Sequence, residues 1–101
     1  CGVTSDLPIV YMGMEDQSEF RSILDGTGEF NFDKLEQELV NRAHQLVAEH
    51  PNVGAILLEC SDMPPFAWAI QSAVQLPVFD FISMLNWIYH GVVQHPYQGF
   101  L

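Results

Sequence analysis

One cysteine of this chain lies where a thiol can do chemistry. Cys60 follows an apolar run, residues 53–59, and precedes the pair Pro64-Pro65, which is typical of the first turn of a helix. This pattern places the thiol at the carboxyl end of a strand, the edge at which open α/β sheets bind ligands. The free N–H groups of the following helix favour a thiolate and bind carboxylates. The pattern therefore predicts proton-transfer or nucleophilic chemistry at Cys60, within one part of a larger site.

The elements that position this cysteine follow from the spacing of apolar residues. Short strands are expected over residues 7–12, 53–59 and 77–81. Helices are expected over about residues 16–25, 33–49, 64–74 and 83–93, the first two opened by capping boxes at Asp16/Glu19 and Asp33/Glu36. Alternating strands and helices predict an α/β fold, a three-layer sandwich with a short parallel sheet flanked by helices.

The length and composition predict that this fold is incomplete. With 101 residues the chain forms one lobe at most, residues 1–101, and it begins at Cys1 rather than at a methionine. Hydrophobic residues make up 49% and charged residues only 16%. The last expected helix is apolar around most of its surface. We therefore expect the chain to be a fragment of a longer protein, to cover that surface with another domain or subunit, and to form a homodimer.

The charge and the cysteines exclude several classes of function. The net charge of −10, with only three basic residues, argues against nucleic acid and against an anionic membrane surface as partners. The two cysteines match no zinc spacing, so no metal site is expected, and they form no disulfide framework. The sequence also lacks a signal peptide and an apolar run of transmembrane length. A cytoplasmic location is the resulting expectation.

One string of residues is distinctive. It reads Glu59-Cys60-Ser61-Asp62-Met63-Pro64-Pro65-Phe66-Ala67, followed by Ile70-Gln71 and Leu76-Pro77-Val78-Phe79-Asp80. It closely resembles the second, carboxyl-terminal lobe of proteins of the aspartate/glutamate (hydantoin) racemase superfamily. The resemblance extends over nearly the whole chain. It implies a cofactor-independent, PLP-independent isomerase of two similar lobes, each with one strand-end cysteine. One thiolate removes the Cα proton of the substrate, and the other thiol returns a proton on the opposite face.

The resemblance also implies roles for individual residues. Cys60 matches the catalytic cysteine of the second lobe, whereas Cys1 fits no strand-end motif. Ser61 and Asp62 become candidates for binding a small carboxylate or amino-acid substrate. Asp80 either contacts that substrate or caps the last helix, and capping is the favoured interpretation. Family enzymes often place a histidine near this cysteine, but none of the four histidines is assigned to that role. With one thiol and half a cleft, the isolated chain is expected to be inactive.

Two alternatives remain open at the level of the sequence. A single-thiol relative, such as a decarboxylase or a cis–trans isomerase of the maleate type, needs only one cysteine as acid or nucleophile. A second strand-end cysteine in the missing lobe would favour racemisation instead. The other alternative is a non-catalytic binding or scaffold lobe with a relic motif, in which Cys60 reacts as an ordinary thiol.

Overall fold

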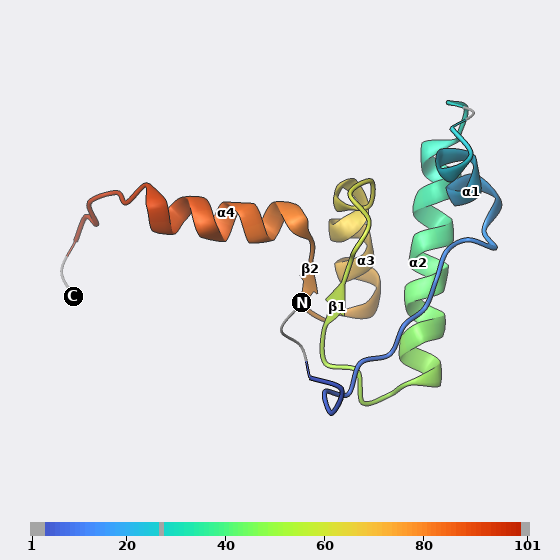
Figure 1. Ribbon diagram of the computed structural model, residues 1–101, viewed down its shortest axis with the longest axis horizontal. Helices are drawn as coiled ribbons and strands as arrows, with labels where there is room; N and C mark the ends of the chain where they lie inside the picture. Colours follow the sequence, from blue (N-terminus) through green and yellow to red (C-terminus); the bar gives the residue numbers. More distant parts are fainter. Residues whose placement is uncertain (1–3, 27, 100–101) are drawn as a thin grey trace. The chain divides into compact units, whose positions relative to one another are not determined.

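A computed structural model describes residues 4–26 and 28–99, which form two compact units. The first unit comprises the described residues up to Val53, and the second begins at Gly54. Over the described ranges the chain contains four α-helices, one 3-10 helix and two short strands (Figure 1). The structure thus confirms a small mixed α/β fold. Whether residues 1–101 act as a single lobe stays a prediction.

The first unit is a pair of helices, α1 (Ser18–Leu24) and α2 (Phe32–Glu49). Apolar side chains of the two helices and of the segment before α1 make the core of this unit, and the buried ones are Met14, Phe20, Leu35, Leu39 and Ala43. The three from α2 recur at steps of four residues, the spacing that lines one face of a helix. The carboxylate of Glu38 joins the helices, because it accepts hydrogen bonds from the backbone N–H groups of Glu19 and Phe20 at 3.1 and 3.2 Å.

The caps expected for these two helices are wrong. The N-cap of α1 is Gln17, whose side chain makes no capping hydrogen bond. Asp16 instead forms an ion pair with Arg42 of α2. The N-cap of α2 is Asn31, whose side chain accepts from the N–H of Lys34 at 3.0 Å. Sequence spacing alone did not reveal that a residue of α2 supplies the acceptor for the first turn of α1.

The strand expected over residues 7–12 is also absent from the described structure, where this segment has no regular secondary structure. Pro8 has no N–H to offer a ladder, and the N–H of Ile9 bonds locally to the carbonyl of Leu7 at 2.9 Å. Leu7, Ile9, Val10 and Tyr11 are all exposed. The three-stranded, three-layer sandwich is therefore not confirmed, and the described sheet has two strands.

The second unit begins with this sheet, in which β1 (Ile56–Leu57) and β2 (Val78–Phe79) run parallel. Ile56 pairs with Val78 and Leu57 with Phe79, and the ladder is flanked by hydrogen bonds from Ile56 N–H to Pro77 and from Leu58 N–H to Phe79. Both strands are shorter than the runs at 53–59 and 77–81 had suggested.

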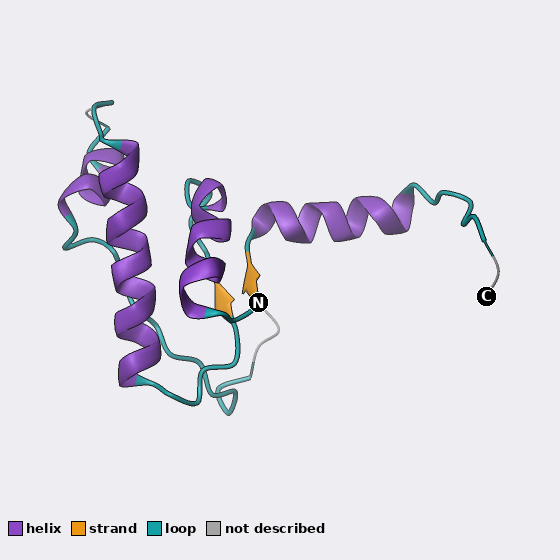
Figure 2. Ribbon diagram, turned by 180° about the vertical axis from the view of Figure 1, so that it is seen from behind, coloured by secondary structure: helices purple, strands orange, loops and turns teal. Residues whose placement is uncertain are grey.

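A helical connection joins the two strands, as Figure 2 shows. A single 3-10 turn, η1 (Pro64–Phe66), leads directly into α3 (Ala67–Val74), which ends at Gln75 in a left-handed conformation with φ of 57°. The prolines occupy the first turn as predicted, where their missing N–H groups have no helical partner to lose. Phe66 and Ile70 are buried, as are Ile56 and Leu58 of the β1 segment, and these four make the core of the second unit.

The last helix, α4 (Phe81–Val92), was predicted from the sequence but starts two residues earlier than expected. Asp80 and Ser83 form a capping box at its start. None of its residues is buried, and its cover by another domain or subunit stays a prediction. Within the described residues no helix combines the length and the apolar character needed to cross a membrane. The cytoplasmic location stays a prediction.

Candidate functional site

Cys60 lies in the turn between β1 and η1, as the sequence predicted. It is a free, half-buried cysteine. Its Sγ donates to Oδ2 of Asp62 over 3.8 Å, and its carbonyl accepts from the N–H of Met63 at 3.1 Å. Phe66 N–H then bonds to Met63 at 3.0 Å, which starts the helical turn. The loop therefore holds the thiol beside a carboxylate at the end of the strand.

The strand before this loop determines which of its side chains face the core and which face solvent. Along residues 56–59 buried and exposed positions alternate: Ile56 and Leu58 are buried, whereas Leu57 and Glu59 are exposed. Regular alternation continues to Cys60, which is less exposed than Glu59. This pattern indicates that Glu59 and Cys60 point to opposite sides. Ser61 and Asp62 follow in the turn and are both exposed.

Asp80 lies at the same edge of the sheet, directly after β2. Its carboxylate accepts from the N–H of Ser83 at 2.7 Å, and its own N–H donates to Oγ of Ser83 at 2.9 Å. The residue is only 8% exposed. These contacts are those of a helix cap, the interpretation favoured from the sequence. Contact between Asp80 and a substrate stays a prediction, as do the binding roles of Ser61 and Asp62.

The other candidates from the sequence lie away from this turn along the chain. Cys1 is outside the described residues. His44 lies in α2 and His50 just after it, both in the first unit. His90 lies in α4, where its ring meets that of Tyr89 edge-on at 6.0 Å between centroids. Over residues 4–26 and 28–99, no group of three His, Cys, Asp or Glu residues has the arrangement of a metal site.

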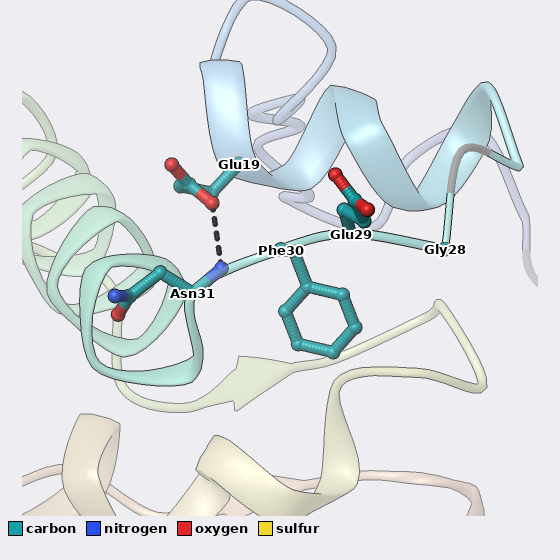
Figure 3. A pocket seen from close by; sticks show the side chains of 5 residues that line it. All are labelled: Glu19, Gly28, Glu29, Phe30 and Asn31. Atoms are coloured by element: carbon teal, nitrogen blue, oxygen red, sulfur yellow. Dashed lines mark hydrogen bonds between the residues drawn. The ribbon is translucent and has the colours of Figure 1, made fainter.

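Two surface hollows, neither lined by Cys60, were not anticipated from the sequence. One is about 530 Å³ and is lined by Glu19, Gly28, Glu29, Phe30 and Asn31. Figure 3 shows it, with the carboxylate of Glu19 accepting from the backbone N–H of Asn31 at 2.8 Å. The other is about 450 Å³ and is lined by Gln71, Ser72, Gln75, Leu76 and Pro77. The only signal for the first was the glycine-rich loop before α2, and such a loop predicts no chemistry.

The fold and the turn define a mixed α/β unit that carries a free cysteine at the end of a parallel strand. Curated relatives have a consistent name. A dimethylsulfoniopropionate lyase of Durusdinium sp. clade D is 35% identical over 100 residues, which cover 98% of this chain and 33% of the relative. Dimethylsulfoniopropionate lyase 3 of Emiliania huxleyi is 34% identical over 104 residues, covering 98% of this chain and 27% of the relative.

A third relative, dimethylsulfoniopropionate lyase 5 of Emiliania huxleyi, is 30% identical over 88 residues, 87% of this chain and 17% of its own length. The chain thus spans a third or less of the length of these relatives. No family model matches the sequence. No solved structure matches it either.

These relatives overturn the family and the function expected from the sequence. The names are those of lyases, so the assignment to the aspartate/glutamate (hydantoin) racemase superfamily and the racemase or isomerase activity are wrong. The single-thiol alternatives, a decarboxylase or a cis–trans isomerase, do not match these names either, whereas the scaffold alternative stays a prediction. The Glu-Cys-Ser-x-Met-Pro-Pro string describes a strand-end cysteine and a helix start. That geometry suits more than one reaction, which is why the motif misdirected the assignment.

Proposed function

We propose that this chain supplies the cysteine-bearing part of a dimethylsulfoniopropionate lyase. The supporting observation is the similarity to lyases of that name, at 35 and 34% identity across 98% of the chain. The activity belongs to the whole protein, of which these residues would form one part. The substrate class is a small carboxylate that also carries a sulfonium cation.

The chemistry of this substrate defines what the site must do. Dimethylsulfoniopropionate has its carboxylate on C2 and its dimethylsulfonium group on C3. A base takes a proton from C2, the C2–H electron pair forms the C2=C3 bond, and the C3–S bond breaks with its pair going to sulfur. The products are acrylate, dimethyl sulfide and the protonated base. Sulfur leaves as a neutral thioether, so the leaving group needs no proton.

Cys60 is the base in this proposal. A thiolate can act as a general base, and a strand end before a helix favours that form over the thiol. After proton transfer the thiol donates to Asp62, the hydrogen bond that the structure contains at 3.8 Å. Asp62 would therefore stabilise the protonated form of Cys60 after the transfer, when the thiol has a proton to donate.

The neighbouring groups support binding of the two charged ends of the substrate. Ser61 is exposed beside Cys60, and its hydroxyl can donate to the substrate carboxylate together with N–H groups of the turn. The exposed carboxylate of Asp62, next to the Cys60 thiol, gives this edge a negative charge, which complements the sulfonium group. If the substrate carboxylate and its sulfonium group are held on opposite sides of the thiol, C2 of the substrate lies next to Sγ of Cys60.

The test uses the longest natural polypeptide that contains this sequence. It is incubated with dimethylsulfoniopropionate, and dimethyl sulfide is measured by headspace gas chromatography while acrylate is followed by NMR. Cys60→Ser is expected to lower kcat/KM about 100-fold or more, the usual contribution of a general base. Cys1→Ser is the matched control, because it removes the other cysteine of these 101 residues, and it is expected to keep the activity.

Each outcome decides the proposal. Equal release of both products, lost in Cys60→Ser and kept in Cys1→Ser, would support it. Release that survives Cys60→Ser would move the base to another residue and reject the role of Cys60. A polypeptide that releases no dimethyl sulfide would reject the lyase activity altogether.

A further inference from the structure

One peptide bond of this chain has the residues for a spontaneous rearrangement of the backbone. Asp25 is followed by Gly26, and no other Asp or Asn in the sequence precedes a glycine. The backbone nitrogen of one residue can attack the side-chain carboxyl of an aspartate before it, and a side chain on the attacking residue hinders the approach. Glycine has no Cβ and leaves its nitrogen unhindered. The Asp25–Gly26 bond is therefore where this attack meets the least hindrance.

The fold places this bond at the exposed end of α1. Asp25 is the C-cap of the helix, and Gly26 is the next residue, with a positive φ of 68°. The side chain of Asp25 is 58% exposed. Among the described residues, no atom outside the chain neighbours of Gly26 lies within 4 Å of the position that a Cβ would take there. The carboxyl is thus accessible, and the space around the glycine is open.

Two contacts hold this bond in its normal form, and both are weak. The N–H of Gly26 donates to the carbonyl of Ile23 at 3.1 Å, and Oδ2 of Asp25 lies 3.7 Å from Nε of Arg21. The hydrogen bond belongs to the last turn of a helix of seven residues, where helices fray. The ion pair is exposed on both sides and contributes little. We propose that Asp25 of the folded chain converts spontaneously to isoaspartate.

The rearrangement requires no reagent other than water. The nitrogen of Gly26 attacks Cγ of the protonated Asp25 carboxyl, the N–Cγ bond forms, and the hydroxyl of the carboxyl leaves as water with the proton of the nitrogen. The product is a five-membered succinimide. Water then adds to one of its two carbonyl carbons. Addition at Cγ restores aspartate, whereas addition at the main-chain carbonyl carbon breaks its bond to nitrogen and gives isoaspartate.

Isoaspartate would change the end of α1. Its main chain is one carbon atom longer, because it runs through the former side chain, and its carboxylate is attached to Cα. The hydrogen bond from Gly26 to Ile23 and the ion pair between Arg21 and Asp25 both depend on the normal spacing. The isomerised chain is therefore expected to lose both contacts and to melt at a lower temperature than the unmodified chain.

The test follows the folded protein during prolonged incubation. The longest natural polypeptide that contains this sequence is kept for several weeks at mildly acidic pH in heavy-oxygen water, below its melting temperature. Each hydrolysed succinimide retains one heavy oxygen, and fragmentation mass spectrometry of the digested protein locates it. Methylation of the peptides by an isoaspartyl methyltransferase identifies the isoaspartate form. Label and isoaspartate are expected to accumulate at Asp25 at least about tenfold faster than at Asp6 or Asp33, since the residues after those two carry side chains.

Asp25→Glu is the matched control, because it keeps the carboxylate but would have to close a larger, six-membered ring. Its peptide is expected to remain unlabelled. Equal labelling in Asp25→Glu, or equal labelling at Asp33, would reject Asp25 as the reactive residue. Labelling of Asp25 in urea but not in the folded protein would mean that the contacts to Ile23 and Arg21 protect the bond, and this result would overturn the proposal as well.

Discussion

Asp16 shows how a single residue of this chain takes a tertiary role where its local pattern predicts a capping one. Its spacing from Glu19 is that of a capping box, but its carboxylate pairs with the guanidinium of Arg42, 26 residues away. The hydrogen bond from Arg42 is the main reason why the pKa of Asp16 is lowered, and the one from Gln17 adds to it. The ion pair thus links the segment before α1 to α2.

The lowered pKa predicts how Asp16→Asn depends on pH. The pKa of this aspartate is lower in the folded than in the unfolded chain, so its stabilisation is complete above the unfolded value. It is lost as the pH falls through the ordinary value of 3.8 toward the lower folded one. Asp16→Asn is therefore expected to lower the melting temperature near neutral pH and to have no effect in strong acid. Circular dichroism melts over a pH series measure both curves.

Arg42→Gln separates this ion pair from other effects of the substitution. If the pair causes the stabilisation, Asp16→Asn in the Arg42→Gln background adds little, because its partner is already gone. Full additivity of the two substitutions, or a difference that persists at low pH, would contradict the assignment. An exposed ion pair stabilises a fold only slightly. The pH at which the difference in melting temperature disappears is therefore more informative than the magnitude of that difference.

At the scale of elements, the sequence predicted the helices whose position is determined by the spacing of their own residues. Leu35, Leu39 and Ala43 mark the buried face of α2 by their spacing, and the prolines mark the start of η1. The strand predicted over residues 7–12 does not form, because a strand needs a neighbouring strand to pair with. The apolar residues of this segment have the sequence pattern of an edge strand but stay exposed. The predicted cap of α1 was wrong for a related reason. Glu38 of α2, distant in sequence, accepts the hydrogen bonds from the first N–H groups of α1.

In the candidate site, too, the features set by adjacent residues could be predicted and the others could not. The position of Cys60 at a strand end and the capping by Asp80 could be predicted, because each depends on a few adjacent residues. The hydrogen bond from Cys60 to Asp62 depends on the exact turn, which residue types alone do not fix. The reaction could not be predicted either. One strand-end thiol serves as a base for isomerisation and for elimination alike, and the groups that choose between them lie partly outside this chain in our proposal.

The capping box of α4 leads to a prediction for that helix. Asp80→Ala removes the acceptor of the Ser83 N–H and is expected to cost about 1 kcal/mol of helix stability. A helix of 12 residues with no buried side chain has little else to hold it, since isolated helices of this length are marginal in water. Hydrogen exchange should therefore lose protection in α4 and keep it in α2.

Asp80→Asn is the control for this substitution, because asparagine also caps helices well. Its exchange pattern should match that of the unsubstituted chain. Protection in α4 that survives Asp80→Ala would mean that contacts other than the capping box hold the helix.

At the scale of the whole molecule, charge is the least balanced property. The net charge of −10 resides entirely in residues 1–80, where 13 acidic residues oppose three basic ones. Two of the three bases are paired in the structure, Arg21 with Asp25 and Arg42 with Asp16. Most carboxylates therefore repel one another across the surface, and this repulsion opposes the compact state.

Salt should consequently stabilise the folded chain. The Debye length falls from about 30 Å at 0.01 M to about 8 Å at 0.15 M, so added NaCl screens repulsion between carboxylates over most of the surface. The two exposed ion pairs weaken at the same time, but they are few compared with the unpaired acids. The melting temperature at neutral pH should rise steeply up to about 0.2 M NaCl and then level off.

Screening depends on ionic strength alone, so NaCl and KCl should give the same curve. A melting temperature that falls with salt would mean that the ion pairs outweigh the repulsion, and a rise that continues linearly above about 1 M would point to salt exclusion from apolar surface.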